Sequence, residues 1–453
     1  MPESIDRAAA RTDLIRNVLA GLTVSFVAIS LGAAFGILSG RGAFAGIISA
    51  GIIALVTSGF GGTRIQCSGP TAPMTAVTAV VVAFAHERFL GEHPGADPDQ
   101  FVNLTLILAG VVLVLAGTLR LGRYIKLVPR VVVSGFMDGI AILIWVDQLR
   151  KLFGWGGKTP YGGDVAANVA IALVTALLVL RLTPVLRRRL PRVGHAIPGT
   201  LVVIVAMSAL VAVAGLDVER VSLQSSIKSL DDLVVLVGSQ IPRDWSAAMV
   251  VLAAPFAVQL ALLAYLDTLL TSLVVDKLTR ERTAQDRELV AQGMANGAVA
   301  LVGGIPGAQA TIRSVLIVNE GATARFAGVL VGVFVLIEML LFQDMLNLIP
   351  QAVFSGVLFK VGYDVFDWQP LKLYLRPARS GAEAALSNPV EGAPPRVTHG
   401  EMLFIAGTAA VTVLWSLNAA VIAFTIVFYV LGKWYAMTDL APVLETEGIG
   451  DED

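Results

Sequence analysis

The chain has 453 residues, of which 56% are hydrophobic and only 15% are charged. Soluble domains carry about 25% charged residues, so this composition excludes a soluble globular protein and indicates a polytopic membrane protein. The net charge of −1 and the lack of a basic tract give no reason to expect nucleic acid as a partner. The single cysteine, Cys67, excludes an internal disulfide bond.

Fourteen apolar segments follow one another along the chain, and a full membrane span needs about 20 such residues. The segments lie at residues 17–37, 43–60, 68–86, 103–119, 131–149, 164–182, 198–216, 247–275, 289–304, 307–319, 326–345, 347–363, 401–416 and 418–435. The charged N-terminus has no signal-peptide cleavage pattern, so the first segment is predicted to remain as a span. Segments 68–86 and 307–319 look short or interrupted. We predict an all-α polytopic membrane protein with 14 spans.

The distribution of Lys and Arg predicts the orientation in the membrane. With the N-terminus inside, 23 of the 33 Lys and Arg residues fall on the cytoplasmic side and 8 on the other side, while Arg313 and Lys360 lie within spans. This asymmetry follows the positive-inside rule. We predict a multi-pass protein of the cell (inner) membrane with both termini in the cytoplasm.

The spans divide the chain into two halves of seven. We predict a cytoplasmic N-terminus at residues 1–13, a first repeat at 14–216 with spans 1–7, an extracytoplasmic loop at 217–246, a second repeat at 247–435 with spans 8–14, and an acidic cytoplasmic tail at 436–453.

Two short motifs recur in the same order in both halves. Residues 70–75, PTAPMT, and 306–311, PGAQAT, share the pattern P-x-A-x-x-T. Residues 128–135, VPRVVVSG, and 349–356, IPQAVFSG, share P-x-x-V-x-S-G after a hydrophobic residue. The members of each pair lie seven spans apart, and seven is odd, so the second copy would cross the membrane in the opposite direction. This is the inverted repeat of many secondary transporters, with chance recurrence as the alternative.

Glycine and proline interrupt both copies of the first motif, in SGPTAPMTAVTAVV and GGIPGAQATIRSVLIV. A proline suits the first turn of a helix because its missing N–H would have no partner there. Pro70 and Pro306 are therefore predicted to mark two half-helix starts. Each helix start carries about half a positive charge and N–H groups without intrahelical partners. Two starts that face each other near the bilayer midplane would form an anion site.

Arg313 falls within the first two turns of the second half-helix and would add a full positive charge. An ionisable residue inside the membrane is a functional-site hypothesis by default. The alternative is that the prolines are kinks and that Arg313 pairs with a carboxylate to stabilise the fold. Phe35, in the first span, could line the pocket, with a plain core position as the alternative.

Asp267 lies in the middle of span eight, and Thr271 follows one turn later on the same helix face. A carboxylate with hydroxyl and backbone carbonyl oxygens would suit a small hard cation such as Na⁺. A carboxylate that takes up a proton would balance charge equally well, and a salt bridge to Arg313 alone is a third possibility. No nucleophile–base pair or metal cluster stands at membrane depth, so we do not expect an enzyme or an organic cofactor.

At these residues the chain resembles the SulP, or sulfate permease, family of inorganic anion transporters. The matching segments are FGGTRIQCSGPTAPMT, LDTLLTSLVVDKLT, RELVAQGMANGAVALVGGIPGAQATIRS and SGVLFKVGYDVFDW. The resemblance implies a uracil-permease-like fold of seven-plus-seven inverted repeats with a core domain and a gate domain. Spans three and ten of such proteins meet head to head around the anion. The resemblance also suggests a homodimer.

Within the family the chain looks most like the BicA-type sodium–bicarbonate symporters. That resemblance implies an anion site and an adjoining sodium site. The predicted anion-binding residues are Phe35, Thr71, Ala72, Gln309, Ala310 and Arg313, and the predicted sodium-binding residues are Asp267, Thr271, Gly307 and Thr311. Asp267, where many members have Glu, and Ser30-Leu31, where many have Pro-Gln, favour sodium-coupled bicarbonate symport by alternating access.

Other functions stay open at this point. Arg313 is common across the family, so sulfate, chloride or dicarboxylate transport, perhaps coupled to protons, is the main alternative. A nucleobase permease shares the fold but uses carboxylates to bind the base, and a non-transporting motor or scaffold is a further reading. The 19 residues after Trp434 are too few for the family's regulatory STAS domain, so we expect that domain to be absent from this chain.

Overall fold

Helices account for most of the described chain, because an apolar segment in a bilayer must satisfy its backbone groups internally. The computed structural model describes residues 2–92, 95–127, 129–156, 159–189, 199–221, 230–341, 347–375, 397–415 and 417–432. The chain divides into two compact units. The first comprises Met1–Ile125 with Val146–Lys360, and the second comprises Lys126–Trp145 with Val361–Asp453.

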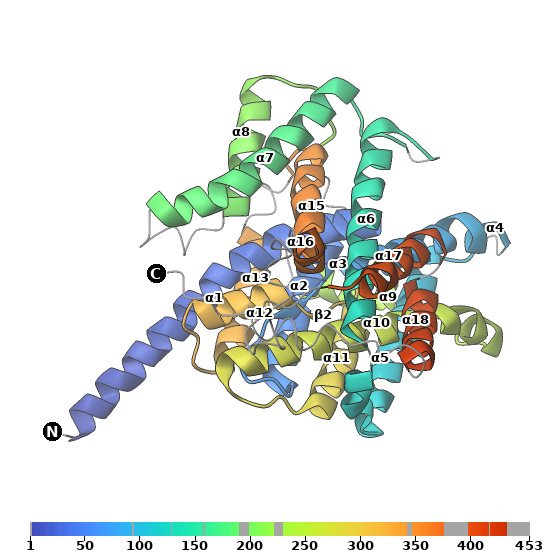
Figure 1. Ribbon diagram of the computed structural model, residues 1–453. Coiled ribbons are helices and arrows are strands. Elements are labelled where there is room, and N and C mark those ends of the chain that lie inside the picture. The colour runs from blue at the N-terminus through green and yellow to red at the C-terminus, as the bar shows by residue number, and fades with distance from the viewer. Residues whose placement is uncertain are drawn as a thin grey trace, which may run out of the picture. The chain divides into compact units, whose positions relative to one another are not determined.

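In the first unit, α1 (Pro2–Ser39), α2 (Gly42–Phe60) and α13 (Phe326–Leu341) pack against one another (Figure 1). Glycines stand where α1 and α2 meet. A Cβ atom on Gly36 would overlap the carbonyl of Gly42, and one on Gly46 would overlap the carbonyl of Gly32. Small residues thus let the two helix backbones touch, as is common between membrane helices.

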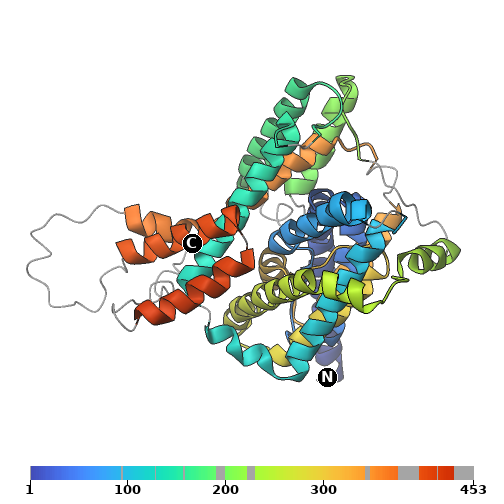
Figure 2. The same cartoon turned by 90° about the vertical axis from the view of Figure 1, so that its right-hand side faces the viewer.

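A second group in the first unit consists of α5 (Pro98–Thr118), α10 (Ala247–Thr279) and α11 (Gln285–Ala300). Helix α5, cyan in Figure 2, packs against both of the others. Gly110 of α5 and Gly293 of α11 face each other so closely that a Cβ atom on either would lie 2.5 Å from the carbonyl oxygen of the other. Helix α11 also packs against α2, which joins the two groups.

Two-residue strands lie inside the interrupted segments. Strand β1 (Ser68–Gly69) pairs antiparallel with β2 (Ala308–Gln309), with Ser68 opposite Gln309 and Gly69 opposite Ala308. Helix α3 (Ala72–Ala83) follows β1, and α12 (Thr311–Asn319) follows β2. Because the strands run in opposite directions, their helices leave the crossing in opposite directions. Helix α10 packs against β2, α3 and α12, and α1 packs against α3 and α12.

The remaining helices of the first unit are α4 (Leu90–Glu92), α7 (Val165–Arg189), α8 (Gly199–Val213), α9 (Leu230–Gln240) and most of α15 (Gln351–Val365). A π-helix, Phe84–Phe89, joins α3 to α4, and a 3-10 helix, Leu121–Leu127, follows α5. Helices α7 and α8 lie side by side, both green in Figure 2.

The second unit contains α16 (Trp368–Leu375), α17 (His399–Leu414), α18 (Leu417–Gly432) and the first part of α6 (Arg130–Phe153). Helices α17 and α18, red in Figure 2, pack together. A capping box starts α17, because Thr398 and Glu401 each accept a backbone N–H of the other. Gly139 of α6 lies against Thr412 of α17, where no larger side chain would fit.

Each of the fourteen predicted segments contains a helix. Six helical stretches among the described residues are long and apolar enough to cross a membrane by themselves: Asp13–Ser39, Gly42–Phe60, Pro98–Thr118, Arg130–Phe153, Val165–Leu182 and Ala247–Asp276. The predicted loop 217–246 includes α9, and the predicted acidic tail, 436–453, lies outside the described residues.

Candidate functional site

Arg313 is the third residue of α12, and only 1% of it is exposed. Its Nη2 donates a hydrogen bond of 2.8 Å to the carbonyl of Pro70, the residue after β1. Its Nε and Nη1 are buried without a hydrogen-bond partner. Gly69 lies directly against the guanidinium, since a Cβ atom there would be 2.7 Å from Nη1. The guanidinium therefore lies at the junction of β1 and α3 with two unused donors.

Asp267 lies at the same junction. Its Oδ2 accepts a hydrogen bond of 2.6 Å from Thr71 Oγ1. Thr71 is the N-cap residue of α3, but its hydroxyl makes no capping bond to that helix. The only ion pairs found among the described residues involve other side chains, so Asp267 and Arg313 do not form a direct salt bridge within 4.0 Å.

The next turn of α10 reaches the second interrupted segment. Thr271 and Thr311 share a hydrogen bond of 2.6 Å between their hydroxyls. The hydroxyl of Thr268 accepts the backbone N–H of Gln309 at 3.3 Å. One face of α10 thus contacts the N-terminus of α3 and the N-terminus of α12. The structure brings Thr271 and Thr311 together, and places Asp267 beside Thr71 of the predicted anion-binding set.

Gly307 lies where the two interrupted segments pass each other. A Cβ atom on it would overlap the carbonyl group of Gly69, so only glycine allows this close approach. The N–H of Gly307 donates to Asn296 Oδ1 at 2.8 Å, and its carbonyl accepts from Asn296 Nδ2 at 3.0 Å. These contacts explain why a glycine is needed at position 307. A role of Gly307 in binding sodium stays a prediction.

The other predicted anion-binding residues lie around the same crossing. Gln309 is buried in β2, and its Nε2 has no hydrogen-bond partner. The N–H of Ala310 donates to the carbonyl of Cys67 at 3.2 Å. Ala72 is the first residue of α3 and is buried. Phe35 is buried in α1, which packs against α3 and α12, and its position in a pocket stays a prediction.

The prediction that Pro70 and Pro306 begin the two half-helices is wrong. Helix α3 begins at Ala72 with Pro73 in its first turn, and α12 begins at Thr311, five residues after Pro306. Thr71, the residue after Pro70, is extended as the N-cap of α3, and strand β2 lies between Pro306 and α12. The first helical hydrogen bonds run from Thr75 N–H to Thr71 and from Ser314 N–H to Ala310.

Three polar residues of α11 that the sequence analysis did not single out also belong to this region. Glu288, Gln292 and Asn296 are all buried and hydrogen-bond to the segments that lead into β1 and β2. Their spacing of four residues along one helix was a signal that could have identified them.

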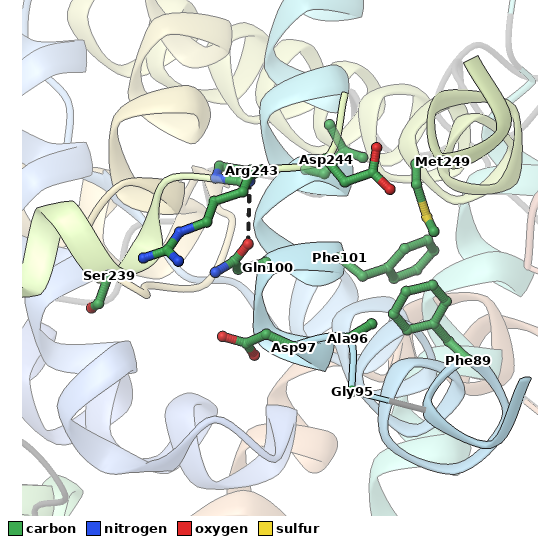
Figure 3. Close-up of a pocket in the computed structure, with 12 residues that line it drawn as sticks. Phe89, Gly95, Ala96, Asp97, Gln100, Phe101, Ser239, Arg243, Asp244 and Met249 are labelled. Atoms are coloured by element: carbon green, nitrogen blue, oxygen red, sulfur yellow. Dashed lines mark hydrogen bonds between the residues drawn. The ribbon is translucent and has the colours of Figure 1, made fainter. Parts of the chain in front are cut away.

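Two cavities lie elsewhere in the first unit. One of about 480 Å³ is lined by aromatic Phe89 and Phe101 on one side and by polar groups on the other, where Gln100 accepts the backbone N–H of Arg243 (Figure 3). A second, of about 350 Å³, is lined by Arg41 and other residues. None of the predicted site residues lines either cavity.

Comparison with known proteins identifies a family that the chain matches. The model of the sulfate permease family matches residues 14–385. The chain is 31% identical over 374 residues to bicarbonate transporter BicA of Picosynechococcus sp., which is 79% of this chain and 62% of that protein. It is 29% identical over 372 residues to YvdB of Bacillus subtilis, whose name refers to sulfate transport, covering 80% of this chain and 66% of that protein. The chain thus spans less than two thirds of each relative.

Two solved structures share the fold. The transmembrane domain of a cyanobacterium bicarbonate transporter BicA matches with a TM-score of 0.72 and 28% identity, over 90% of this chain and 97% of that chain. The murine Slc26a9 anion transporter in the inward-facing state matches with a TM-score of 0.72 and 16% identity, over 93% and 68%. These likenesses confirm the predicted polytopic helical fold with inverted repeats.

Proposed function

The chain belongs to the sulfate permease family, and from that premise we propose that it is a secondary active transporter of a small inorganic anion. Bicarbonate is the proposed cargo and sodium the proposed coupling ion. The names of its relatives are those of transporters, which supports transport rather than catalysis.

The observation that carries the proposal is the meeting of Arg313, Asp267 and the paired threonines where α3 and α12 begin. An anion between those N-termini would meet two helix dipoles and the unused donors of Arg313. Buried donors without partners cost about 1–3 kcal/mol each, so a ligand that accepts from them removes that cost. These features together favour a small anion with oxygen acceptors.

Sodium fits the donor set next to this anion site. Asp267 offers a carboxylate, and Thr271 and Thr311 offer hydroxyl oxygens 2.6 Å apart. Hard cations prefer oxygen ligands of this kind. A cation beside Asp267 would attract the anion and be attracted by it, so each ion raises the affinity for the other by the same factor.

The proposal also includes how the two repeats cross the membrane. The first repeat, 14–216, and the second, 247–435, would cross in opposite directions with the loop 217–246 outside and both termini in the cytoplasm. Alternating access would then expose a site between the repeats to one side at a time. We place the protein in the cell (inner) membrane, as a homodimer.

Sulfate is the second candidate cargo. YvdB, at 29% identity, supports it, whereas two proteins named bicarbonate transporter BicA, at 31% and 32%, support bicarbonate. Both anions present oxygen acceptors that Arg313 and helix N-termini would bind.

The test is uptake of radiolabelled bicarbonate into proteoliposomes, with and without an inward sodium gradient and with empty liposomes as control. Uptake that rises with sodium supports the proposal in full. Labelled sulfate is measured in parallel under sodium and proton gradients. If the protein takes up sulfate but not bicarbonate, sulfate is the cargo. Uptake of neither anion would contradict the proposed function.

A further inference from the structure

A buried polar face runs along α11. Glu288, Gln292 and Asn296 are spaced by four residues, so they lie on one face of the helix. Their exposed fractions are 0%, 0% and 1%. A buried polar group without a hydrogen-bond partner costs free energy, so three such residues on one helix face require partners.

Glu288 binds the segment that leads from α2 into β1. Its Oε2 accepts the backbone N–H groups of Gly62 at 2.8 Å and Thr63 at 2.9 Å. The same oxygen accepts from Gln66 Nε2 at 3.0 Å. Three donors from residues 62–66 therefore converge on one carboxylate oxygen more than 220 residues away in sequence.

Gln292 extends these contacts to β1 itself. Its Nε2 donates to Ser68 Oγ at 2.7 Å and to Glu288 Oε1 at 3.1 Å. Ser68 Oγ in turn donates to Gln66 Oε1 at 3.0 Å. Four side chains, Glu288, Gln66, Ser68 and Gln292, thus form a closed ring of hydrogen bonds that includes the first residue of β1.

Asn296 binds the other crossing segment. Its side chain exchanges two hydrogen bonds with the backbone of Gly307, the residue before β2. Its Nδ2 also donates to the carbonyl of Gln292 at 2.9 Å. One helix face therefore contacts both interrupted segments, β1 through Glu288 and Gln292, and β2 through Asn296.

We propose that Glu288, Gln292 and Asn296 are positioning residues that fix β1 against β2. These three residues, which we call the clamp, would fix the Pro70 carbonyl beside Arg313. They would also fix Thr71 and Thr311 beside α10. Its consequence for transport rests on the proposed function. The clamp also leads to a structural prediction that can be tested without a transported anion.

The chain offers a matched control for Asn296. Asn17 is 2% exposed, and its Oδ1 accepts the N–H groups of Thr323 and Ala324, both at 3.0 Å. Its Nδ2 donates to Thr323 Oγ1 at 2.9 Å. Asn17→Ala therefore removes a buried Asn that binds a distant backbone segment, as Asn296→Ala does, but leaves both strands untouched.

Cys67 reports on the crossing without any transport assay. It is the only cysteine of the chain and is fully buried. Its N–H donates to Ser314 Oγ at 3.2 Å, and its carbonyl accepts the N–H of Ala310. A maleimide reaches this buried thiol only when the structure around it opens, so its labelling rate measures local opening at the crossing.

The experiment labels purified, monodisperse protein with a maleimide, and Cys67→Ala serves as the blank. Asn296→Ala is expected to label about tenfold faster than the unmodified chain, because it loses both bonds to Gly307. Asn17→Ala is expected to label at the unmodified rate. Equal labelling rates in Asn296→Ala and Asn17→Ala would overturn the clamp, whatever the cargo.

A milder variant covers the case in which Asn296→Ala does not fold. Asn296→Asp keeps an acceptor for the Gly307 N–H but loses the donor, and intermediate labelling is expected. In uptake, the same variants are expected to raise the KM for the carried anion at least about fivefold while Asn17→Ala does not. Faster labelling with an unchanged KM would overturn the positioning role. If the unmodified chain carries no anion, the proposed function fails and labelling still decides the clamp.

Discussion

At the scale of single residues, Arg313 differs from an ordinary structural arginine. It is buried, makes one hydrogen bond to a backbone carbonyl, and has no carboxylate within ion-pair distance among the described residues. A buried charged group with unsatisfied donors is costly, and such a group persists only where something compensates for that cost. The proposed anion would accept hydrogen bonds from the two unused donors, Nε and Nη1.

Arg313→Ala is expected to weaken anion binding at least about tenfold, because a charge-assisted hydrogen bond is lost. The loss should grow as ionic strength falls, since screening decreases. The measurement is the concentration of anion at half-maximal uptake. Arg325→Ala is the control, because Arg325 also donates to backbone carbonyls, but to those of Ser58 and Gly61 rather than to that of Pro70. An unchanged apparent affinity in Arg313→Ala would make Arg313 structural.

Asp267→Asn is expected to abolish the sodium dependence of uptake while the protein still folds, because it removes a charge with little change of shape. The measurement is bicarbonate uptake at a series of sodium concentrations, together with the melting temperature. Asp276→Asn on the same helix is the control, since Asp276 binds the N–H and hydroxyl of Thr283 outside the site. Sodium-dependent uptake at the normal level in Asp267→Asn would refute the cation site.

At the scale of elements, close backbone contact determines where helices lie. Helices α3 and α12 each follow a two-residue strand, and the two strands pair with each other. Helices α10 and α11 contact both interrupted segments. Glycines at the α5–α11 contact allow the two helix backbones to touch. Packing and hydrogen bonds between elements thus stabilise a break that would be costly in lipid.

Two glycines one turn apart on α11 test this packing. A Cβ atom on Gly293 would lie 2.5 Å from the carbonyl oxygen of Gly110, whereas one on Gly297 would meet nothing within 4 Å. Gly293→Ala is expected to lower the melting temperature by several degrees, because backbone atoms must move. Gly297→Ala is expected to leave it unchanged or raise it, since alanine favours a helix by about 0.5–1 kcal/mol. The same shift in both variants would contradict the close α5–α11 contact.

At the scale of the whole molecule, the question is how the chain crosses the membrane. The fourteen predicted segments all contain helices, and the fold matches that of a solved anion-transporter domain. The orientation rests on the asymmetry of Lys and Arg. The predicted orientation has the loop 217–246 outside and the segment after α10 inside.

Labelling with a membrane-impermeant maleimide tests this orientation in a Cys67→Ala background. Val235→Cys introduces a thiol at an exposed position of α9, and Arg282→Cys introduces one at an exposed position just after α10. Val235→Cys is expected to react on intact cells, and Arg282→Cys only after the membrane is opened. The reverse pattern would place the N-terminus outside, and reaction of both on intact cells would contradict the span count.

Much of the candidate site was predictable because its signals are local. A charge within an apolar segment, as at Arg313 or Asp267, is visible without a structure. The recurrence of P-x-A-x-x-T placed the two breaks, and the structure pairs the strands within them. The starts of α3 and α12 were misplaced at Pro70 and Pro306, because Pro73 rather than Pro70 occupies the first turn of α3, and strand β2 separates Pro306 from α12.

Hydrophobicity, charge and short motifs are properties of neighbouring residues, so the amino-acid sequence alone was enough to identify a multi-pass membrane protein, its fourteen apolar segments, the two breaks and the family. The contacts of Thr71 with Asp267, of Thr271 with Thr311 and of α11 with both strands became visible in the three-dimensional fold alone. Two of these contacts join residues about 200 positions apart. Such partners are selected by how helices pack and by which buried polar groups remain to be satisfied, and no local pattern specifies either.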